Sequence, residues 1–393
     1  MDLLTYWHKL PIAARRYILY HCIITPLLFT WYIVPYLMLE IGLNVAESGI
    51  LFTVGSALSA CLNFVIGRWL DRGCPNILMA IISVLDGFSY LLYYFGFMLR
   101  NVSLILAGIT VERISFGLYP VYAVYEYEVY PEEIREKAYV YHNVLPFLSQ
   151  AITYPVIGYV LGVLLPDIRT LINFLLLTAF ISFLYALIPI YWLPKAGRSV
   201  SFSKRERTIC KIPTGLYLIV LVLILIGLST MLAPPLILVN LFKEVMGGGL
   251  FELSIYDAIS AMTIIVFSLP LLKVRKERGF LMVILGLFLL CSSNITLAFT
   301  KAISFALLAS FLASAGYAIM DPFLMDILFS HIPRDRKGTV LGSIAGIRRL
   351  LGIISPAIAG ILAEKFFPGA PYIISSFLVL ISIVIIVLVA KHS

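Results

Sequence analysis

Long apolar stretches fill nearly all of this chain, and they constrain its fold more than any other feature. A helix needs about 20 apolar residues to cross the roughly 30 Å hydrocarbon core of a bilayer. Twelve stretches qualify, near 16–39, 46–66, 76–98, 102–125, 139–164, 170–193, 212–241, 253–272, 280–299, 302–329, 339–362 and 371–390. The chain is therefore predicted to be an all-α, multi-pass membrane protein with twelve transmembrane helices.

The composition excludes several classes of protein. Hydrophobic residues make up 61% of the chain and charged residues 13%, whereas soluble domains carry about 25% charged residues. A water-soluble enzyme is therefore excluded, and the short polar connections leave no room for a soluble domain of ordinary size. The five cysteines are scattered without a CxxC pair, so we expect neither a disulfide framework nor a metal site, and no cofactor.

The positive charges predict how the helices are oriented. The net charge is +8, which by itself could indicate a nucleic-acid partner. However, 21 Lys and Arg residues fall in the two tails and every second connection, and only five fall in the other connections. Basic loops stay in the cytoplasm. We therefore expect a plasma-membrane protein with both termini cytoplasmic and no nucleic-acid partner.

The longest polar connection divides the chain into two similar halves. It covers residues 195–211 and separates predicted six-helix bundles at 1–194 and 212–393. Short motifs repeat between the halves: Arg135 and Arg336 are 201 residues apart, as are Pro155 and Pro356. Duplicated halves are a common way to build an alternating-access transporter, with its site between them at the bilayer midplane.

The loop after the second span carries a recognisable motif. In GRWLDRGCPN, Gly67 precedes Asp71 and Arg72 by four and five residues, and Glu277-Arg278 follow the eighth span in a partial copy. With the twelve spans and the central basic loop, this pattern resembles the major facilitator superfamily over essentially the whole chain. The resemblance implies two pseudo-symmetric six-helix bundles, latched on the cytoplasmic side by charged loops. The gate residues it indicates are Gly67, Asp71, Arg72, Arg135, Glu277, Arg278 and Arg336. Cys74 replaces the second glycine of the motif, and ordinary solvated loop charge is the alternative interpretation.

Charged residues inside the apolar spans need an explanation, because each costs about 2.5–3.5 kcal/mol at the bilayer centre. They are Asp86, Glu112, Arg113, Asp321, Arg348 and Arg349. One interpretation is that they pair across helices and only hold the bundle together. The other is that they bind substrate or protons. Because spans one, four, seven and ten line the cavity in the family, the resemblance favours the second interpretation for Glu112, Arg113 and Asp321.

Glu112 and Arg113 are neighbours, so their side chains point about 100° apart on a helix. We expect one to face the cavity and the other to contact a neighbouring helix. Arg113 and Gly117 also match a motif that the family associates with proton-coupled antiport. We therefore expect protons to bind at one of the acids, Glu112 or Asp321, as the halves rock. Asp86 and Arg348 are further candidates.

Aromatic and histidine side chains supply a second set of candidates. Tyr32 and Tyr119 lie near mid-span and could stack on an organic substrate, although packing and interfacial anchoring explain most membrane tyrosines. His21 and His142 lie nearer the cytoplasmic end. They could handle protons or substrate, or simply be hydrogen-bonded helix histidines.

These features predict a secondary transporter that moves a small organic solute by alternating access, exchanges it for protons in efflux, and works as a monomer. Coupled uptake of an organic anion or sugar is the alternative within this class. A membrane enzyme is disfavoured because the chain has no HExxH, no GxxxxGK[ST] and no His-rich cluster. A channel would more often be an oligomer of shorter subunits.

Overall fold

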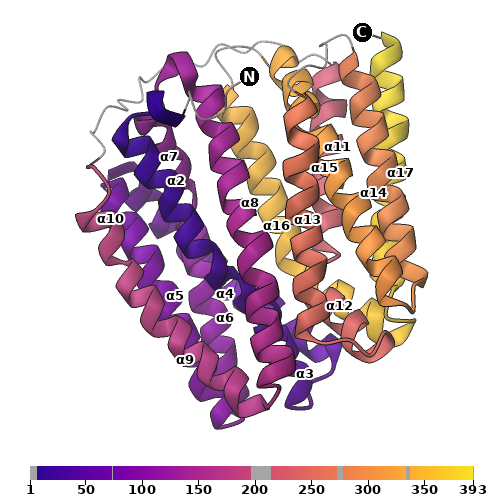
Figure 1. Ribbon diagram of the computed structural model, residues 1–393. Coiled ribbons are helices and arrows are strands. Elements are labelled where there is room, and N and C mark those ends of the chain that lie inside the picture. The colour runs from indigo at the N-terminus through magenta and orange to yellow at the C-terminus, as the bar shows by residue number, and fades with distance from the viewer. Residues whose placement is uncertain (1–6, 73, 196–213, 272–277, 333–336, 393) are drawn as a thin grey trace. The chain divides into compact units, whose positions relative to one another are not determined.

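The computed structural model describes residues 7–72, 74–195, 214–271, 278–332 and 337–392, apart from some side chains within these ranges. Throughout the described part of the chain the regular structure is helical (Figure 1). Each of the twelve predicted spans corresponds to one helix or to two or three consecutive helical elements.

The first six spans use the following elements. Span one is α2 (Ile12–Ile24), η1 (Thr25–Phe29) and α3 (Thr30–Glu40), span two is α4 (Val45–Arg72), and span three is α5 (Pro75–Met98). Span four is α6 (Val102–Leu118) and α7 (Pro120–Val129), span five is α8 (Arg135–Tyr159) and η3 (Val160–Leu164), and span six is α9 (Ile168–Tyr185) and α10 (Leu187–Tyr191). A short turn, η2 (Glu132–Ile134), precedes α8.

The last six spans use the remaining elements. Span seven is α11 (Thr214–Met231), α12 (Pro235–Asn240) and η4 (Leu241–Val245), and span eight is α13 (Leu250–Leu271). Spans nine to twelve are α14 (Gly279–Phe299), α15 (Ile303–His331), α16 (Lys337–Lys365) and α17 (Ala370–His392).

Eleven of these segments are long and apolar enough to cross a membrane, and the described part of α4 adds a shorter apolar helix, Val45–Ala60. The prediction of an all-α, twelve-span membrane protein is confirmed.

Proline interrupts three of the spans. Pro26 lies in η1 between α2 and α3, Pro120 opens α7 two residues after α6 ends, and Pro234 precedes α12, which begins at Pro235. Proline lacks the N–H that an α-helix needs and its ring clashes with the preceding turn. A break inside a membrane is tolerated only where protein or a wet cavity surrounds it. The breaks in spans one, four and seven therefore indicate protein-lined interior positions.

The chain forms two compact units. The first comprises Met1–Leu43 and Leu51–Phe202, and the second comprises Asn44–Ile50 and Ser203–Ser393. The division between Phe202 and Ser203 lies outside the described residues, within the segment 195–211 where the sequence places the linker. The grouping of Asn44–Ile50 with the second unit is not predicted by the sequence.

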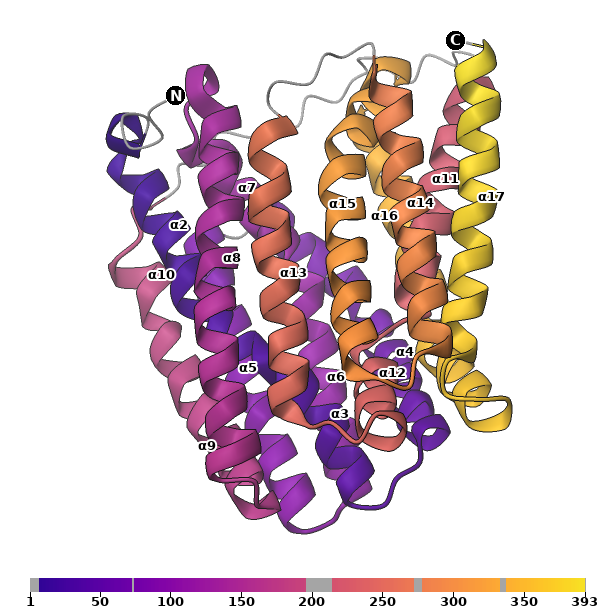
Figure 2. The same ribbon diagram turned by 45° about the vertical axis from the view of Figure 1, so that its right-hand side comes forward.

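In the first unit, α5 packs between α6 and α9, and α2 packs along α8, as Figures 1 and 2 show from two directions. Glycines make the close helix contacts possible. A Cβ on Gly108 of α6 would lie 2.7 Å from the ring of Tyr93 on α5, and one on Gly87 of α5 would lie 2.7 Å from the ring of Phe183 on α9. Small residues at such contacts are typical of membrane helices.

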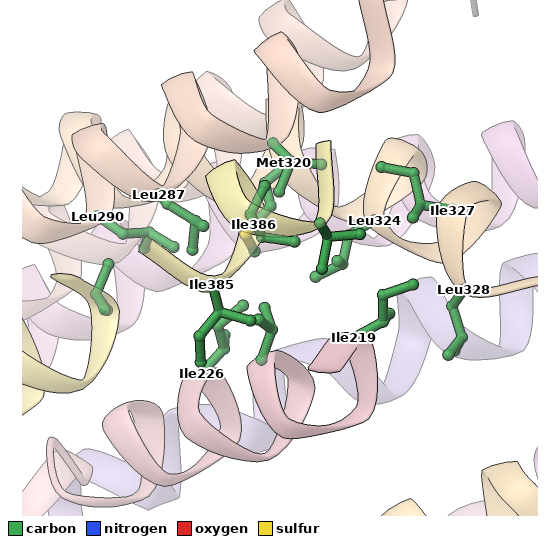
Figure 3. Close-up of a cluster of buried hydrophobic side chains, with 14 of the residues drawn as sticks. Ile219, Ile226, Leu287, Leu290, Met320, Leu324, Ile327, Leu328, Ile385 and Ile386 are labelled. Atoms are coloured by element: carbon green, nitrogen blue, oxygen red, sulfur yellow. The ribbon is translucent and has the colours of Figure 1, made fainter. Parts of the chain in front are cut away.

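In the second unit, α14 packs against α15 and α17, and α11 packs against α16 and α17. Gly286 and Gly316 bring α14 and α15 together, because a Cβ on either would lie 2.6–2.7 Å from the other's carbonyl oxygen. One buried cluster of this unit is aliphatic apart from a cysteine. Figure 3 shows Ile219, Leu287, Leu324 and Ile386 converging from α11, α14, α15 and α17.

Candidate functional site

A pocket of about 190 Å³ lies within the first unit and combines an acid with aromatic walls. Its aromatic side chains include Trp31, Tyr90, Tyr119, Tyr122 and Tyr185. Its polar side chains include His21, Ser83 and Asp86. At about 30 Å³ per water molecule, the volume suits a small solute or several waters.

The proline breaks position several of these residues. Trp31 follows the break of span one, and Tyr119 sits at the break of span four. The Tyr119 ring lies 5.6 Å from that of Tyr122, whose ring is 5.2 Å from His21. Thr30 donates a hydrogen bond to the Tyr90 hydroxyl at 3.0 Å. The pocket wall is thus built from residues of α2, η1, α3, α5, α7 and α9, together with Tyr119 between α6 and α7.

Asp86 is the carboxylate among the described residues that line this pocket. It interacts electrostatically with Glu112 on α6. Glu112 is buried, with 7% of its surface exposed, and accepts a hydrogen bond from the Tyr93 hydroxyl at 3.1 Å. Two acids of the first unit therefore share one electrostatic environment, with Asp86 at the pocket and Glu112 behind it.

Arg113 leaves the helix in a different direction from Glu112, because adjacent helix residues diverge by about 100°. Its guanidinium lies 5.6 Å from the ring of Phe52 on α4 and 5.0 Å from the ring of Phe116. Its Nε is buried without a hydrogen-bond partner in the described part of the chain. Neither Glu112 nor Arg113 is among the described residues that line the pocket. Glu112 contacts α5 and Arg113 contacts α4.

A second polar cluster joins α2, α7 and α8. The ligand atoms of His21, Glu126 and His142 all lie within 4.8 Å of one another. The Tyr17 hydroxyl donates to Glu126 Oε1 at 2.9 Å, and the Tyr130 hydroxyl lies 2.7 Å from His142 Nδ1. Burial raises the pKa of Tyr130, so its phenol keeps its proton and can donate. This grouping was not predicted from the sequence, although His21, Glu126 and His142 all fall near the same end of consecutive or neighbouring spans.

The second unit holds its own charged pair. Asp321 on α15 interacts electrostatically with Arg348 on α16, and both interact with Tyr317. The Arg348 side chain runs against Gly227 of α11, where a Cβ would come within 2.3 Å of its Nε. The Tyr317 hydroxyl hydrogen-bonds Thr230 at 2.7 Å. The sequence named Asp321 and Arg348, and the structure brings these two together. The side chain of Arg349 is outside the described set.

The two predicted aromatic residues lie in different places. Tyr119 lines the pocket. Tyr32 is buried, 9% exposed, with its ring 5.9 Å from that of Phe29, and is not part of the described lining.

Two of the predicted gate residues have described side chains. Arg135 opens α8 and donates to the carbonyls of Tyr130 and Tyr127, with its guanidinium 4.6 Å from the Tyr127 ring. Arg278 is exposed immediately before α14. The side chains of Gly67, Asp71 and Arg72 at the end of α4 lie outside the described residues, as do Glu277 and Arg336.

These observations define a class: a multi-pass membrane protein of twelve helices that buries a polar pocket within its first six. The family model of the Major Facilitator Superfamily matches residues 17–356. The chain belongs to this superfamily, and it is a membrane transport protein and not an enzyme. No curated protein matches the sequence.

Solved structures agree with this fold. A bacterial homologue of the iron transporter ferroportin, in its inward-facing state, is similar with a TM-score of 0.74 at 14% identity, covering 96% of this chain and 98% of that chain. A bacterial metal transporter gives a TM-score of 0.69 at 14% identity, with 97% and 99% covered. The human organic anion transporter MFSD10 gives 0.64 at 15% identity, with 96% and 99% covered. At such identities the likeness shows the fold alone.

Proposed function

We propose that this chain is a secondary active transporter that exchanges a small organic solute for protons by alternating access, in the direction of efflux. The observation that carries the proposal is the pocket of the first unit, which places Asp86 among aromatic side chains. Polar groups at membrane depth are expensive and mark substrate or ion pathways. A pocket that keeps one there is best explained by binding.

The lining favours a solute with a positive charge. Among the described lining residues Asp86 is the acid, and there is no Lys or Arg. Aromatic faces attract cations, an effect worth about 2 kcal/mol or more where water is excluded. The structural relatives are named for an organic anion, a metal, a nucleoside and a peptide, so the fold alone does not select the solute. Coupled uptake of an organic anion or sugar is the alternative, for which Arg348 would be the anion-binding group.

Proton coupling is supported by the pairing of acids with arginines. A carboxylate in low dielectric binds a proton more readily, and an approaching guanidinium favours its release. Glu112 and Arg113 are adjacent and interact electrostatically, and Asp321 and Arg348 form the matching pair in the second unit. We propose that Asp86 and Glu112 take up the exchanged proton, and that Asp321 is the corresponding acid of the second unit.

Placement in the cell follows from the charge distribution. We propose that the protein acts as a monomer in the plasma membrane with both termini in the cytoplasm. There the basic loops, including Arg135 and Arg278, would form the gate.

The test uses purified protein in proteoliposomes on a solid support. Steps of organic amines, organic anions and sugars are applied with and without a pH gradient, and the current is recorded. A saturable, gradient-dependent current for the amines is expected. Currents only for anions or sugars would overturn the cation assignment, and gradient-independent amine transport would overturn proton coupling.

Glu112→Gln sharpens this test because it removes the charge and keeps the volume. We expect gradient-driven transport to be lost while solute exchange persists in part. The matched control is Glu244→Gln, which neutralises a half-exposed carboxylate in η4 beside Lys243. Driven transport at the wild-type rate in Glu112→Gln would remove Glu112 from the coupling site.

A further inference from the structure

The cluster of His21, Glu126 and His142 has the composition of a transition-metal site. Imidazole nitrogen and carboxylate oxygen are ligands of Zn²⁺, and two histidines with one carboxylate form a recurrent open site for divalent metals. The three residues come from α2, α7 and α8, so the folded unit, not a local motif, assembles them.

The spacing of the ligand atoms fits such an ion. Zn²⁺ bonds of about 2.0–2.2 Å in tetrahedral geometry place neighbouring ligand atoms roughly 3.4 Å apart. His142 Nδ1 already lies 3.4 Å from Glu126 Oε1. All three ligand atoms lie within 4.8 Å of one another. A small side-chain rotation of His21 would therefore complete a three-ligand set.

His21 has an unused nitrogen. Its Nε2 is buried and has no hydrogen-bond partner in the described part of the chain. Buried polar atoms are almost always satisfied, so such an atom calls for a bound water or ion. The centroid of the His21 ring lies 4.5 Å from that of the His142 ring, so the two imidazoles are close enough to bind the same ion.

The surroundings resemble the support that metal ligands receive. Tyr17 donates to Glu126 Oε1 at 2.9 Å and so fixes the carboxylate. Groups that hold ligands in place in this way typically change metal affinity 10–100-fold. The Tyr130 hydroxyl contacts His142 Nδ1 at 2.7 Å. An ion bound through His142 Nδ1 would replace the Tyr130 hydroxyl as the partner of this nitrogen. The phenol oxygen would then lie next to the ion.

We propose that His21, Glu126 and His142 bind one divalent transition-metal ion of the Zn²⁺ kind within the first unit. The site goes beyond the organic-solute transport proposed above, since Asp86 and the aromatic walls do not take part in it. His21 also lines the solute pocket. The ion would therefore sit against the wall of the pocket, with Glu126 balancing part of its charge.

The test measures metal binding by the purified full chain, with any polyhistidine tag removed and the protein stripped with a chelator. Zn²⁺ is titrated calorimetrically, and Co²⁺ is titrated as a spectroscopic substitute whose visible absorption reports nitrogen and oxygen ligation. One equivalent of Zn²⁺ is expected to bind the wild type. Glu126→Gln and His142→Ala should each raise the dissociation constant at least tenfold and weaken the Co²⁺ absorption.

The matched control is His8→Ala, which removes an exposed histidine on the lead-in to the first span and should bind Zn²⁺ like the wild type. Thermal unfolding without metal checks that each variant is folded, and Zn²⁺ should raise the unfolding temperature of wild type and His8→Ala only. Wild-type protein that binds no Zn²⁺ would overturn the proposal. Unchanged affinity in folded Glu126→Gln would do so as well.

Discussion

The interiors of the two units are built from different side chains. The core of the first unit is rich in tyrosine and includes Tyr17, Tyr125 and Tyr130 beside the histidine cluster. The buried cluster of the second unit shown in Figure 3 consists of Leu, Ile, Val and Met with one cysteine. Both clusters are closely packed, but the cluster of the first unit contains several buried tyrosine rings, whereas the ring of Tyr317 is only partly buried against the cluster of the second unit.

Because their side chains differ, the two cores are stabilised in different ways. Lipid tails are as apolar as leucine, so an aliphatic core gains its stability from close packing and small-residue contacts. A core of hydroxyls, imidazoles and carboxylates must satisfy every polar group or bind something that does. We therefore expect the aliphatic core to respond to substitution mainly in stability, and the polar core mainly in function.

The largest expected effect is on transport in the polar unit. Asp86→Asn keeps the shape of the side chain and removes its charge from the pocket. Gradient-driven solute transport should fall at least about a hundredfold, equivalent to roughly 2.8 kcal/mol, while the unfolding temperature stays close to that of the wild type. Proteoliposome currents and thermal unfolding measure the two quantities. A loss of stability with normal transport would contradict the contrast between the cores.

The second effect is on stability in the aliphatic unit. In Gly286→Ala the new methyl group would lie 2.6 Å from the carbonyl oxygen of Gly316. Forcing α14 and α15 apart should cost about 1–3 kcal/mol, with unchanged transport per folded molecule.

Gly346→Ala is its matched control, because a Cβ there meets nothing within 4 Å. Thermal unfolding in detergent should show a loss for Gly286→Ala and none for Gly346→Ala. Equal unfolding temperatures for the two variants would show that the close helix contact is not needed.

A smaller effect is expected behind the pocket. Tyr93→Phe removes the hydrogen bond that Glu112 accepts, which should lower the free energy of unfolding by about 1 kcal/mol. Tyr94→Phe, on the next residue of α5, is the control. An equal effect of the two substitutions in thermal unfolding would mean that the hydrogen bond contributes nothing.

The smallest effect lies in the connection before α9. Asp167 caps this helix, and hydrogen bonds from the Thr170 hydroxyl and backbone N–H hold its pKa below the ordinary value of 3.8. The charged form is thus favoured in the folded state. Its contribution to stability is present above pH 3.8 and is lost as the pH falls through the lowered folded pKa.

Asp167→Asn keeps a capping side chain and removes the charge. The wild type should unfold at a slightly higher temperature than the variant near pH 7, and the difference should shrink below pH 3.8. A difference that does not change with pH would rule out the charge as its cause.

The fold could be predicted from the sequence because membrane insertion is a local property. Each span is recognised from about 20 apolar residues alone. The breaks are less local, because helices break at Pro26, Pro120 and Pro234 but continue through Pro35 and Pro322. The charged residues could be named as candidates from the sequence, since a charge is conspicuous in an apolar run, and their roles stay predictions. In the second unit, Asp321 interacts electrostatically with Arg348.

The sites could not be predicted to the same extent. Glu112 and Arg113 were expected to include the cavity residue, but the described pocket is lined by Asp86, and Glu112 lies behind it against Tyr93. Which side of a helix faces the pocket depends on its rotation and on the neighbours it packs against. The hydropathy of the sequence specifies neither the rotation of a helix nor its neighbours.

By itself, the sequence determined that this protein crosses the membrane with twelve spans and which charged residues lie within those spans. Hydrophobic length and the charges within it are properties of one segment, so one segment suffices to read them. Only the tertiary structure decided that Asp86 faces an aromatic pocket and that His21, Glu126 and His142 converge from α2, α7 and α8. Such sites arise from side-chain distances between helices far apart in the chain, and those distances are fixed by packing.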